Sequence, residues 1–321
     1  MKSVSKMLIV VIFVFLYTGV ASAAFDDIII GARPAGMGGA FVALSDDTNA
    51  PMYNPAGMGY MSSAQVGFTH LRMFAGAVNY NYASVILPLN VAGSFGVSFG
   101  MLGEDSGVYS ERTVAFSYAK KLIDSISLGI NLKMLNTGFD DSNIWVSENP
   151  YFVESSVSAF TADLGILIRP VSGLNIGLAS ENLIPADISI SETEEEKVPI
   201  NIRFGLAYNL AAVASSAQQP ALKEVLETTT LSIAGASRKE YESTATKIST
   251  GIEAWFAKGV LGLRAGYKIK KLQQTASSAS VGASIKIPVT ELNLQLDYAL
   301  QLFGGDVEDN AVHRVSLALS L

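Results

Sequence analysis

Residues 292–300, which read Leu-Asn-Leu-Gln-Leu-Asp-Tyr-Ala-Leu, decide the fold of this chain. Apolar side chains occupy every second position and polar or small ones lie between them, which is the pattern of a β-strand with one apolar face. The same alternation recurs at 91–101, 126–134 and 200–208. We count fourteen such segments and predict an all-β chain with strands at 64–71, 76–87, 91–102, 112–120, 125–136, 157–168, 173–180, 199–210, 228–236, 246–257, 259–270, 277–287, 291–301 and 311–321.

The strand lengths and their connections indicate an antiparallel transmembrane β-barrel. About ten residues at ~3.3 Å rise and ~40° tilt cover about 25 Å, the height of the apolar band of an outer-membrane barrel. Links such as 88–90 and 121–124 are short, whereas the links that alternate with them, such as 137–156 and 181–198, are long and polar. Bacterial barrels alternate tight periplasmic turns with long outer loops in this way. The link 211–227 falls on the short side but is long, and its apolar spacing predicts an amphipathic helix.

Alternation alone does not say which face of the strands points outward, and a soluble β-sandwich would turn the apolar face inward. The polar face carries charged side chains, which are costly in a dry core but tolerated in a wet or ion-paired lumen. With fourteen strands, this favours a barrel whose apolar face contacts lipid. The charged residues then either line a route through the lumen or pair across neighbouring strands. These luminal polar residues are Lys133, Asp163, Arg203, Glu253, Arg264, Asp297 and Arg314.

Composition excludes several classes of function. The chain has 321 residues, no cysteine and a formal net charge of −7, so it offers no basic surface for nucleic acid. Without cysteine there is no thiol chemistry, and two histidines give no metal-ligand spacing, so we expect no cofactor and no metal site. His70 and His313 flank the first and last strands, which leaves an outer-membrane hydrolase as the weakest alternative. We expect no enzyme and assign no catalytic residue.

The first residues have the features of an export signal. Lys2 and Lys6 precede an apolar run at 7–17, and Ala21-Ser22-Ala23 supplies the small residues that signal peptidase requires. The run is short for a membrane helix, which needs about 20 apolar residues. We predict a cleavable signal peptide at 1–23 and a location in the bacterial outer membrane, where lipid surrounds the barrel.

Residues 24–63 do not alternate, and we predict that they form an N-terminal hatch ahead of the barrel at 64–321. The stretch 31–40, Gly-Ala-Arg-Pro-Ala-Gly-Met-Gly-Gly-Ala, is a tightly turned chain that a barrel wall can approach closely. Ser45 or Asp46 can cap a short helix that ends at Asn54-Pro55. The lumen of an even-numbered barrel can accommodate the roughly forty compact residues that precede it, so we expect them inside the lumen as a plug.

This N-terminal stretch resembles the signature of the PorV/PorQ family, within the wider FadL-like group of fourteen-stranded outer-membrane proteins. The resemblance rests on residues 31–40, on Asp46-Asp47 and on Asn54-Pro55-Ala56-Gly57. Glu181-Asn182-Leu183 is a second, weaker match. Motif similarity covers about 30 residues, and the rest of the chain is similar in strand count and size.

The resemblance implies a barrel closed by a hatch. The residues that it assigns to the hatch and the ligand path are Arg33, Asp46, Asp47, Asn54, Pro55 and Ala56. In FadL-like transporters a hydrophobic small-molecule ligand passes the hatch and leaves sideways into the bilayer, which favours apolar molecules by about 0.8 kcal/mol per buried methylene. In PorV-like members the barrel instead serves type IX secretion as a component of a protein complex. The motif is common to both groups, so the sequence leaves both functions open.

Overall fold

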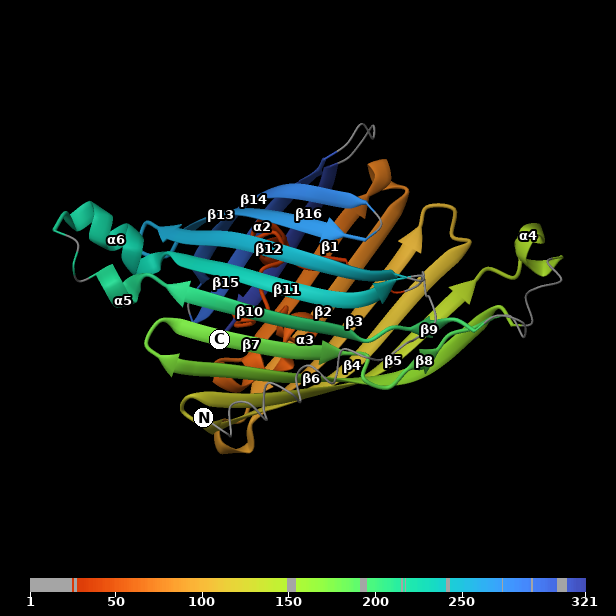
Figure 1. Cartoon of the computed structure of the whole chain (residues 1–321), viewed down its shortest axis with the longest axis horizontal. Coiled ribbons are helices and arrows are strands. Elements are labelled where there is room, and N and C mark those ends of the chain that lie inside the picture. The colour runs from red at the N-terminus through yellow and green to blue at the C-terminus, as the bar shows by residue number, and fades with distance from the viewer. Residues whose placement is uncertain are drawn as a thin grey trace.

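Fourteen antiparallel strands pair around a complete circle, and β1 pairs with β16 to close it (Figure 1). The computed structural model describes residues 25, 28–148, 154–190, 195–214, 216, 218–240, 243–272, 274–289, 291–304 and 311–321. The predicted signal peptide at 1–23 lies outside the described residues. The strands of the barrel are β1 (Gln65–Met73), β2 (Val78–Pro88), β3 (Ser94–Glu104), β4 (Tyr109–Ile123), β5 (Ile126–Phe139), β6 (Ser156–Val171), β7 (Leu174–Glu181), β10 (Asn201–Asn209), β11 (Thr230–Glu240), β12 (Ser243–Phe256), β13 (Leu261–Lys271), β14 (Thr275–Val289), β15 (Leu292–Phe303) and β16 (Ala311–Ser320).

The predicted all-β, closed, fourteen-stranded antiparallel barrel is confirmed, and the predicted segments coincide with its strands. Boundaries differ by a few residues. At the end of the barrel with the long connections, four strands extend three or four residues beyond the predicted segments: β4, β5, β11 and β12. There the apolar alternation stops before the backbone pairing does.

The two faces of the wall are oriented as their chemistry requires. On β5, Leu132 points outward and is 59% exposed, whereas its neighbours Asn131 and Lys133 point inward and are buried. Phe116 and Phe160 on the adjacent strands are likewise exposed, by 62% and 71%. An apolar exterior of this extent around a polar interior suits a lipid environment rather than water.

Residues 28–61, which we call the N-terminal segment, lie inside this wall. The segment contains the helices α2 (Ala32–Gly36) and α3 (Ala50–Tyr53) and the 3-10 helix η2 (Pro55–Tyr60). It bonds to inward-facing groups on opposite sides: Ala32 N donates to Ser316 Oγ of β16 (2.9 Å), and Ser232 Oγ of β11 donates to Ala40 O (2.7 Å). Only a chain inside the circle can reach both.

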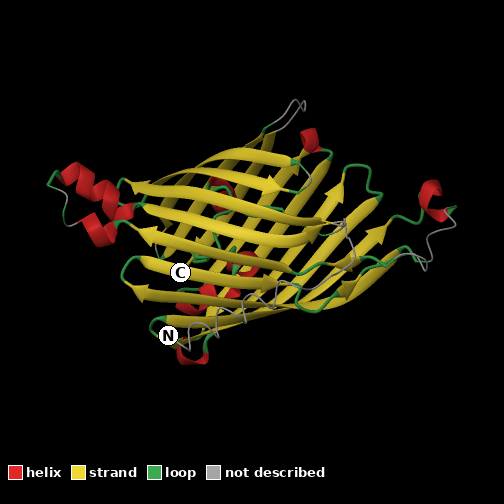
Figure 2. Ribbon diagram, in the orientation of Figure 1, coloured by secondary structure: helices red, strands yellow, loops and turns green. Residues whose placement is uncertain are grey.

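The ends of the barrel carry different connections (Figure 2). At one end lie the short turns, together with η4 (Asn90–Ala92), α5 (Ala211–Ala214) and α6 (Pro220–Thr228). At the other end lie the longer connections, η3 (Phe74–Gly76) and α4 (Ile144–Ser147). The helix predicted within 211–227 is therefore present. No helix among the described residues is both long enough and apolar enough to span a membrane.

The connection at 181–198 differs from the exposed polar loop that we expected. It contains a small hairpin, β8 (Ala186–Asp187) and β9 (Lys197–Val198), that folds inward over the lumen. Ile188 and Val198 are buried against Leu135 of the wall. The Ser189 hydroxyl donates a hydrogen bond to the Asp187 carboxylate, and so does the Ser189 backbone amide. Both bonds, the hydroxyl's more than the amide's, lower the pKa of that carboxyl below its usual value. They also tighten the turn.

Candidate functional site

Arg33 is the centre of the contacts between the N-terminal segment and the wall. Its Nε and Nη2 donate to both carboxylate oxygens of Glu253 on β12, each at 2.8 Å. Its Nη1 donates to Asp46 at 2.5 Å and to Asp47 at 2.9 Å. The bidentate geometry is the strong form of an arginine–carboxylate pair. Arg33 therefore joins two parts of the segment to each other and to the wall.

The ion pairs continue along the wall from Glu253. Glu253 accepts a third bond, at 2.5 Å, from Nε of Arg264 on β13, and Arg264 Nη1 reaches Asp297 on β15 at 3.2 Å. Ser284 bonds to both Arg264 and Asp297. The Arg264 side chain is fully buried, so each of these charges depends on its partners for solvation.

Asn54 fixes the other end of the segment. Its amide donates to Val42 O within the segment and to Ile166 O on β6, both at 3.0 Å, and its carbonyl accepts from Ala56 N at 3.1 Å. Pro55 follows as the first residue of η2, where its missing N–H costs nothing. Ser127 Oγ of β5 donates to Ala56 O (2.8 Å). The Asn-Pro-Ala motif is thus a turn that is hydrogen-bonded to the inner face of the wall.

We expect Asn54→Ala to destabilise the folded chain by about 2–4 kcal/mol, because two buried carbonyls would lose their donor and one amide its acceptor. The measurement is the urea midpoint of the detergent-folded protein. Asn54→Asp keeps the acceptor but not the donors and should be at least as damaging. Asn293→Ala, at an exposed position of β15, is the matched control. Equal midpoints for Asn54→Ala and the control would contradict this role.

Three more of the predicted luminal charges, Lys133, Asp163 and Arg203, are also paired. Lys133 Nζ lies 2.7 Å from Asp163 and donates to Asn182 Oδ1 at 2.7 Å. Arg203 pairs with Glu181 at 2.9 Å and donates to Met52 O of the segment at 2.7 Å. These contacts favour the pairing alternative over a charged open route.

Arg314 on β16 holds the segment through hydrogen bonds. It donates to Ile29 O at 2.8 Å and to Gln301 at 2.9 Å. The wall therefore holds the segment at its beginning through Arg314, at Met52 through Arg203 and at Arg33 through Glu253. The contacts lie on three separate regions of the wall.

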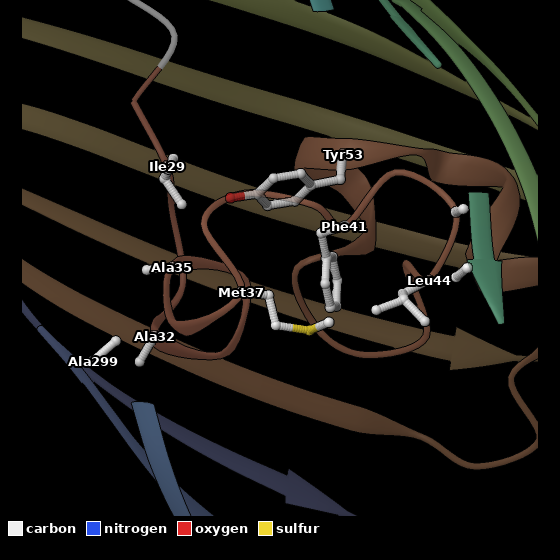
Figure 3. Packing of buried hydrophobic residues seen from close by; sticks show 10 residues of the cluster. Ile29, Ala32, Ala35, Met37, Phe41, Leu44, Tyr53 and Ala299 are labelled. Atoms are coloured by element: carbon white, nitrogen blue, oxygen red, sulfur yellow. The ribbon is translucent and has the colours of Figure 1, made fainter. Parts of the chain in front are cut away.

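An apolar cluster fills the middle of the segment (Figure 3). The rings of Phe41 and Tyr53 meet edge to face with centroids 5.3 Å apart, and Met37 and Leu44 pack beside them. Tyr53 OH donates to Ile30 O at 2.8 Å. Burial of these side chains adds to the polar contacts with the wall, so the segment has a small core of its own.

Two of the cavities in the lumen are separate from each other, and both have charged side chains in their lining. One of about 450 Å³ opens toward the short turns and is lined by Arg33, Asp46, Glu253 and Lys286 among others. A smaller one of about 80 Å³ lies beyond the segment and is bordered by Lys133 and Arg203 among others. The two share no lining residue, and the segment contributes to both.

Residues 47–305 match the family model described as "Type IX secretion system membrane protein PorP/SprF". The chain belongs to the PorP/SprF family. No curated protein matches this PorP/SprF family member in sequence. The matched family is not PorV/PorQ. The resemblance of this chain to PorV/PorQ rests mainly on residues that precede the matched span. What is confirmed is the coarser expectation of an outer-membrane β-barrel with a FadL-like fold.

Several solved barrels share the fold of this PorP/SprF chain. A Pseudomonas aeruginosa FadL homologue has a TM-score of 0.62 at 10% identity, covering 91% of this chain and 98% of that one. The Ralstonia pickettii toluene transporter TbuX has a TM-score of 0.57 at 13% identity, covering 90% and 97%. The Pseudomonas putida toluene transporter TodX has 0.56 at 12%, covering 90% and 96%. Family and fold together support the outer membrane as the location.

Some luminal residues of this PorP/SprF chain escaped the sequence analysis. Arg238 on β11 is buried and donates to Phe25 O at 2.7 Å, but the predicted strand ended at residue 236. Lys247 on β12 is buried at a position whose parity could have identified it. The two histidines point outward: His70 bonds Asn81 (2.9 Å) and His313 bonds Tyr298 (2.7 Å). They do not meet in the lumen.

Proposed function

We propose that this PorP/SprF family member is a non-enzymatic outer-membrane component of a type IX secretion complex that acts by binding other proteins. The observation that carries the proposal is the N-terminal segment, which is fixed inside the barrel by the buried Arg33–Glu253 ion pair and by hydrogen bonds from Arg203 and Arg314. A barrel filled in this way suits a scaffold better than a conduit. The motif at 31–57, which resembles the PorV/PorQ family, supports a role in the same secretion system.

The chemistry of the interior supports a scaffold rather than a path for apolar cargo. An apolar molecule gains free energy by burying its surface against apolar side chains. Here the walls of both cavities carry charged side chains, and Glu253 and Lys133 hold buried ion pairs. Passage would require separating buried charges, and a buried pair that loses one partner costs about 3–5 kcal/mol.

The end with the short turns supplies a surface for a protein partner. α5 and α6 extend beyond the wall there (Figure 1). Val213 and Leu222 on these helices are 44% and 48% exposed. Because short turns mark the periplasmic end of bacterial barrels, we infer that these helices face the periplasm.

Transport of a hydrophobic small molecule remains the second candidate, and one specific observation favours it. Asn54-Pro55-Ala56 lies in the lumen against β5 and β6, as the resemblance to FadL-like hatches implies. In this alternative the segment would have to move. Two structural neighbours are described as toluene transporters, but at 12–13% identity they share the fold alone.

Two measurements distinguish the two candidate functions: co-purification of a partner and uptake of an apolar molecule. We expect the affinity-tagged full chain, extracted from its native bacterium in a mild detergent, to carry another outer-membrane or periplasmic protein in fixed stoichiometry. Cells expressing the chain should take up labelled toluene and oleate no faster than cells with an empty vector. An unrelated tagged barrel is the control for extraction. A chain that purifies alone and accelerates uptake would overturn the scaffold role in favour of transport.

A further inference from the structure

We propose that a cleft between the β4–β5 hairpin and the inward-folded β8–β9 hairpin binds a cationic side chain, lysine or arginine, from a protein partner. This proposal rests on the proposed function, because a protein would supply the side chain. The cleft has a volume of about 300 Å³, at the lower end of ligand sites. It lies at the end with the long connections, which is the outer side by the rule for bacterial barrels.

Two pairs of directly opposite residues form one wall of the cleft. Tyr109 on β4 lies opposite Phe139 on β5, and Glu111 lies opposite Thr137. The two rings are 4.9 Å apart between centroids and tilted by 54°. Tyr109 OH donates to Glu111 at 2.8 Å, which holds the phenol and the carboxylate together. The wall thus presents aromatic faces beside a negative charge.

The other wall comes from the β8–β9 hairpin. Ile188 lies at the base and is fully buried, and Glu196 stands at the side. Glu196 is held by its backbone: its N–H donates to Ser189 Oγ at 2.6 Å and its carbonyl accepts from Ile188 N at 2.9 Å. The position of this second carboxylate is therefore set by the hairpin.

The charge of the cleft specifies the chemistry of its occupant. Two carboxylates line it, and none of its described lining residues is basic. The nearby Lys197 pairs with Glu195 at 2.6 Å, outside the lining. Glu111 also borders the smaller luminal cavity, where Lys133 and Arg238 lie, so Glu196 is the carboxylate specific to the cleft. A cation between carboxylates and ring faces gains both ionic and cation–π attraction.

One buried hydroxyl in the lining of the cleft, that of Thr137, lacks a hydrogen-bond partner among the described residues. Thr137 is 4% exposed, and its Oγ1 makes no hydrogen bond among the described residues. A buried hydroxyl without a partner is unfavourable, and it can accept from an ammonium or guanidinium N–H. The apolar stem of the same side chain would lie against Ile188 and Phe139. Lysine and arginine combine such a stem with a cationic end.

The test uses saturation-transfer difference NMR on the detergent-folded full chain. The probes are N-acetyl-lysine methylamide and N-acetyl-arginine methylamide, with N-acetyl-norleucine methylamide as the uncharged match. We expect the cationic probes to bind at least about fivefold more tightly than the norleucine probe. Glu196→Gln and Phe139→Leu should each weaken them by about fivefold or more. Glu195→Gln removes the same charge one residue away and should leave binding unchanged.

Heat-modifiable gel mobility shows that each variant is folded before its binding is measured. Equal binding of the lysine and norleucine probes, no binding at all, or an equal loss in Glu195→Gln and Glu196→Gln would each overturn the proposal. Any of these results would leave the co-purifying protein partner in place. Loss of the partner with cleft binding retained would instead count against the scaffold role alone.

Discussion

Arg33→Ala is expected to destabilise the folded chain by about 3 kcal/mol and to release the N-terminal segment from the β12 side of the lumen. Breaking a buried ion pair costs about 3–5 kcal/mol. The lower end applies here because Glu253 keeps its bond to Arg264 and because the side chain of Asp46 is 46% exposed. The measurements are the urea midpoint in detergent and the rate at which an added protease cuts within residues 28–61.

Two variants make this result interpretable. Arg72→Ala removes an exposed arginine of β1 and should leave both measurements at the wild-type value. Arg33→Ala combined with Glu253→Gln, compared with each single variant, measures the coupling between the two groups: because they are in contact, the loss of stability in the double variant should differ from the sum of the two single losses. If Arg33→Ala behaves like Arg72→Ala, the ion pairs do not hold the segment in place.

Gly129→Val is expected to have the second large effect, a loss of at least about 3 kcal/mol that prevents the segment from seating against β5. A Cβ at this position would collide with the backbone of Pro55 and Ala56. Overpacking a core costs typically 1–3 kcal/mol where neighbours can shift, and a backbone turn bonded to Ser127 has little freedom to do so. The readouts are the fraction of heat-modifiable barrel and the protease sensitivity of residues 28–61.

The control for this substitution lies on the same wall. At Gly103 on β3, a Cβ would meet no other atom of the described residues within 4 Å, so Gly103→Val makes the same chemical change without a collision. Normal assembly of the Gly103 variant with failure of the Gly129 variant would assign the effect to contact with the segment. Normal assembly of both would show that the segment yields to the wall.

The strands could be predicted because each must present one apolar face to its surroundings, and this requirement repeats every two residues. Some ion pairs follow from the hairpins: Glu253 and Arg264 are directly opposite on β12 and β13. To assign this pair from the sequence alone, the position of the turn between β12 and β13 must be known to within one residue. The pair of Arg33 with Glu253 spans 220 residues and obeys no local rule. The inward-facing charges were therefore predictable, but their partners within the segment were not.

The β8–β9 hairpin was missed for a different reason. Its strands have two residues each, too short for alternation to register, and an acidic run lies between them. Acidic runs are usually solvated, so the sequence around this one predicts an exposed loop. The burial of Ile188 and Val198 depends on an apolar surface at Leu135, which only the closed barrel creates.

The position of residues 28–61 constrains the route by which this protein is made. Their contacts extend over inward faces from β1 to β16, and β1 pairs with β16 along a continuous ladder. Once β1 has paired with β16, a folded segment cannot enter the lumen without breaking its hydrogen bonds to the wall. We therefore expect the sheet to close around residues 28–61, so that insertion into the bilayer and filling of the lumen occur together.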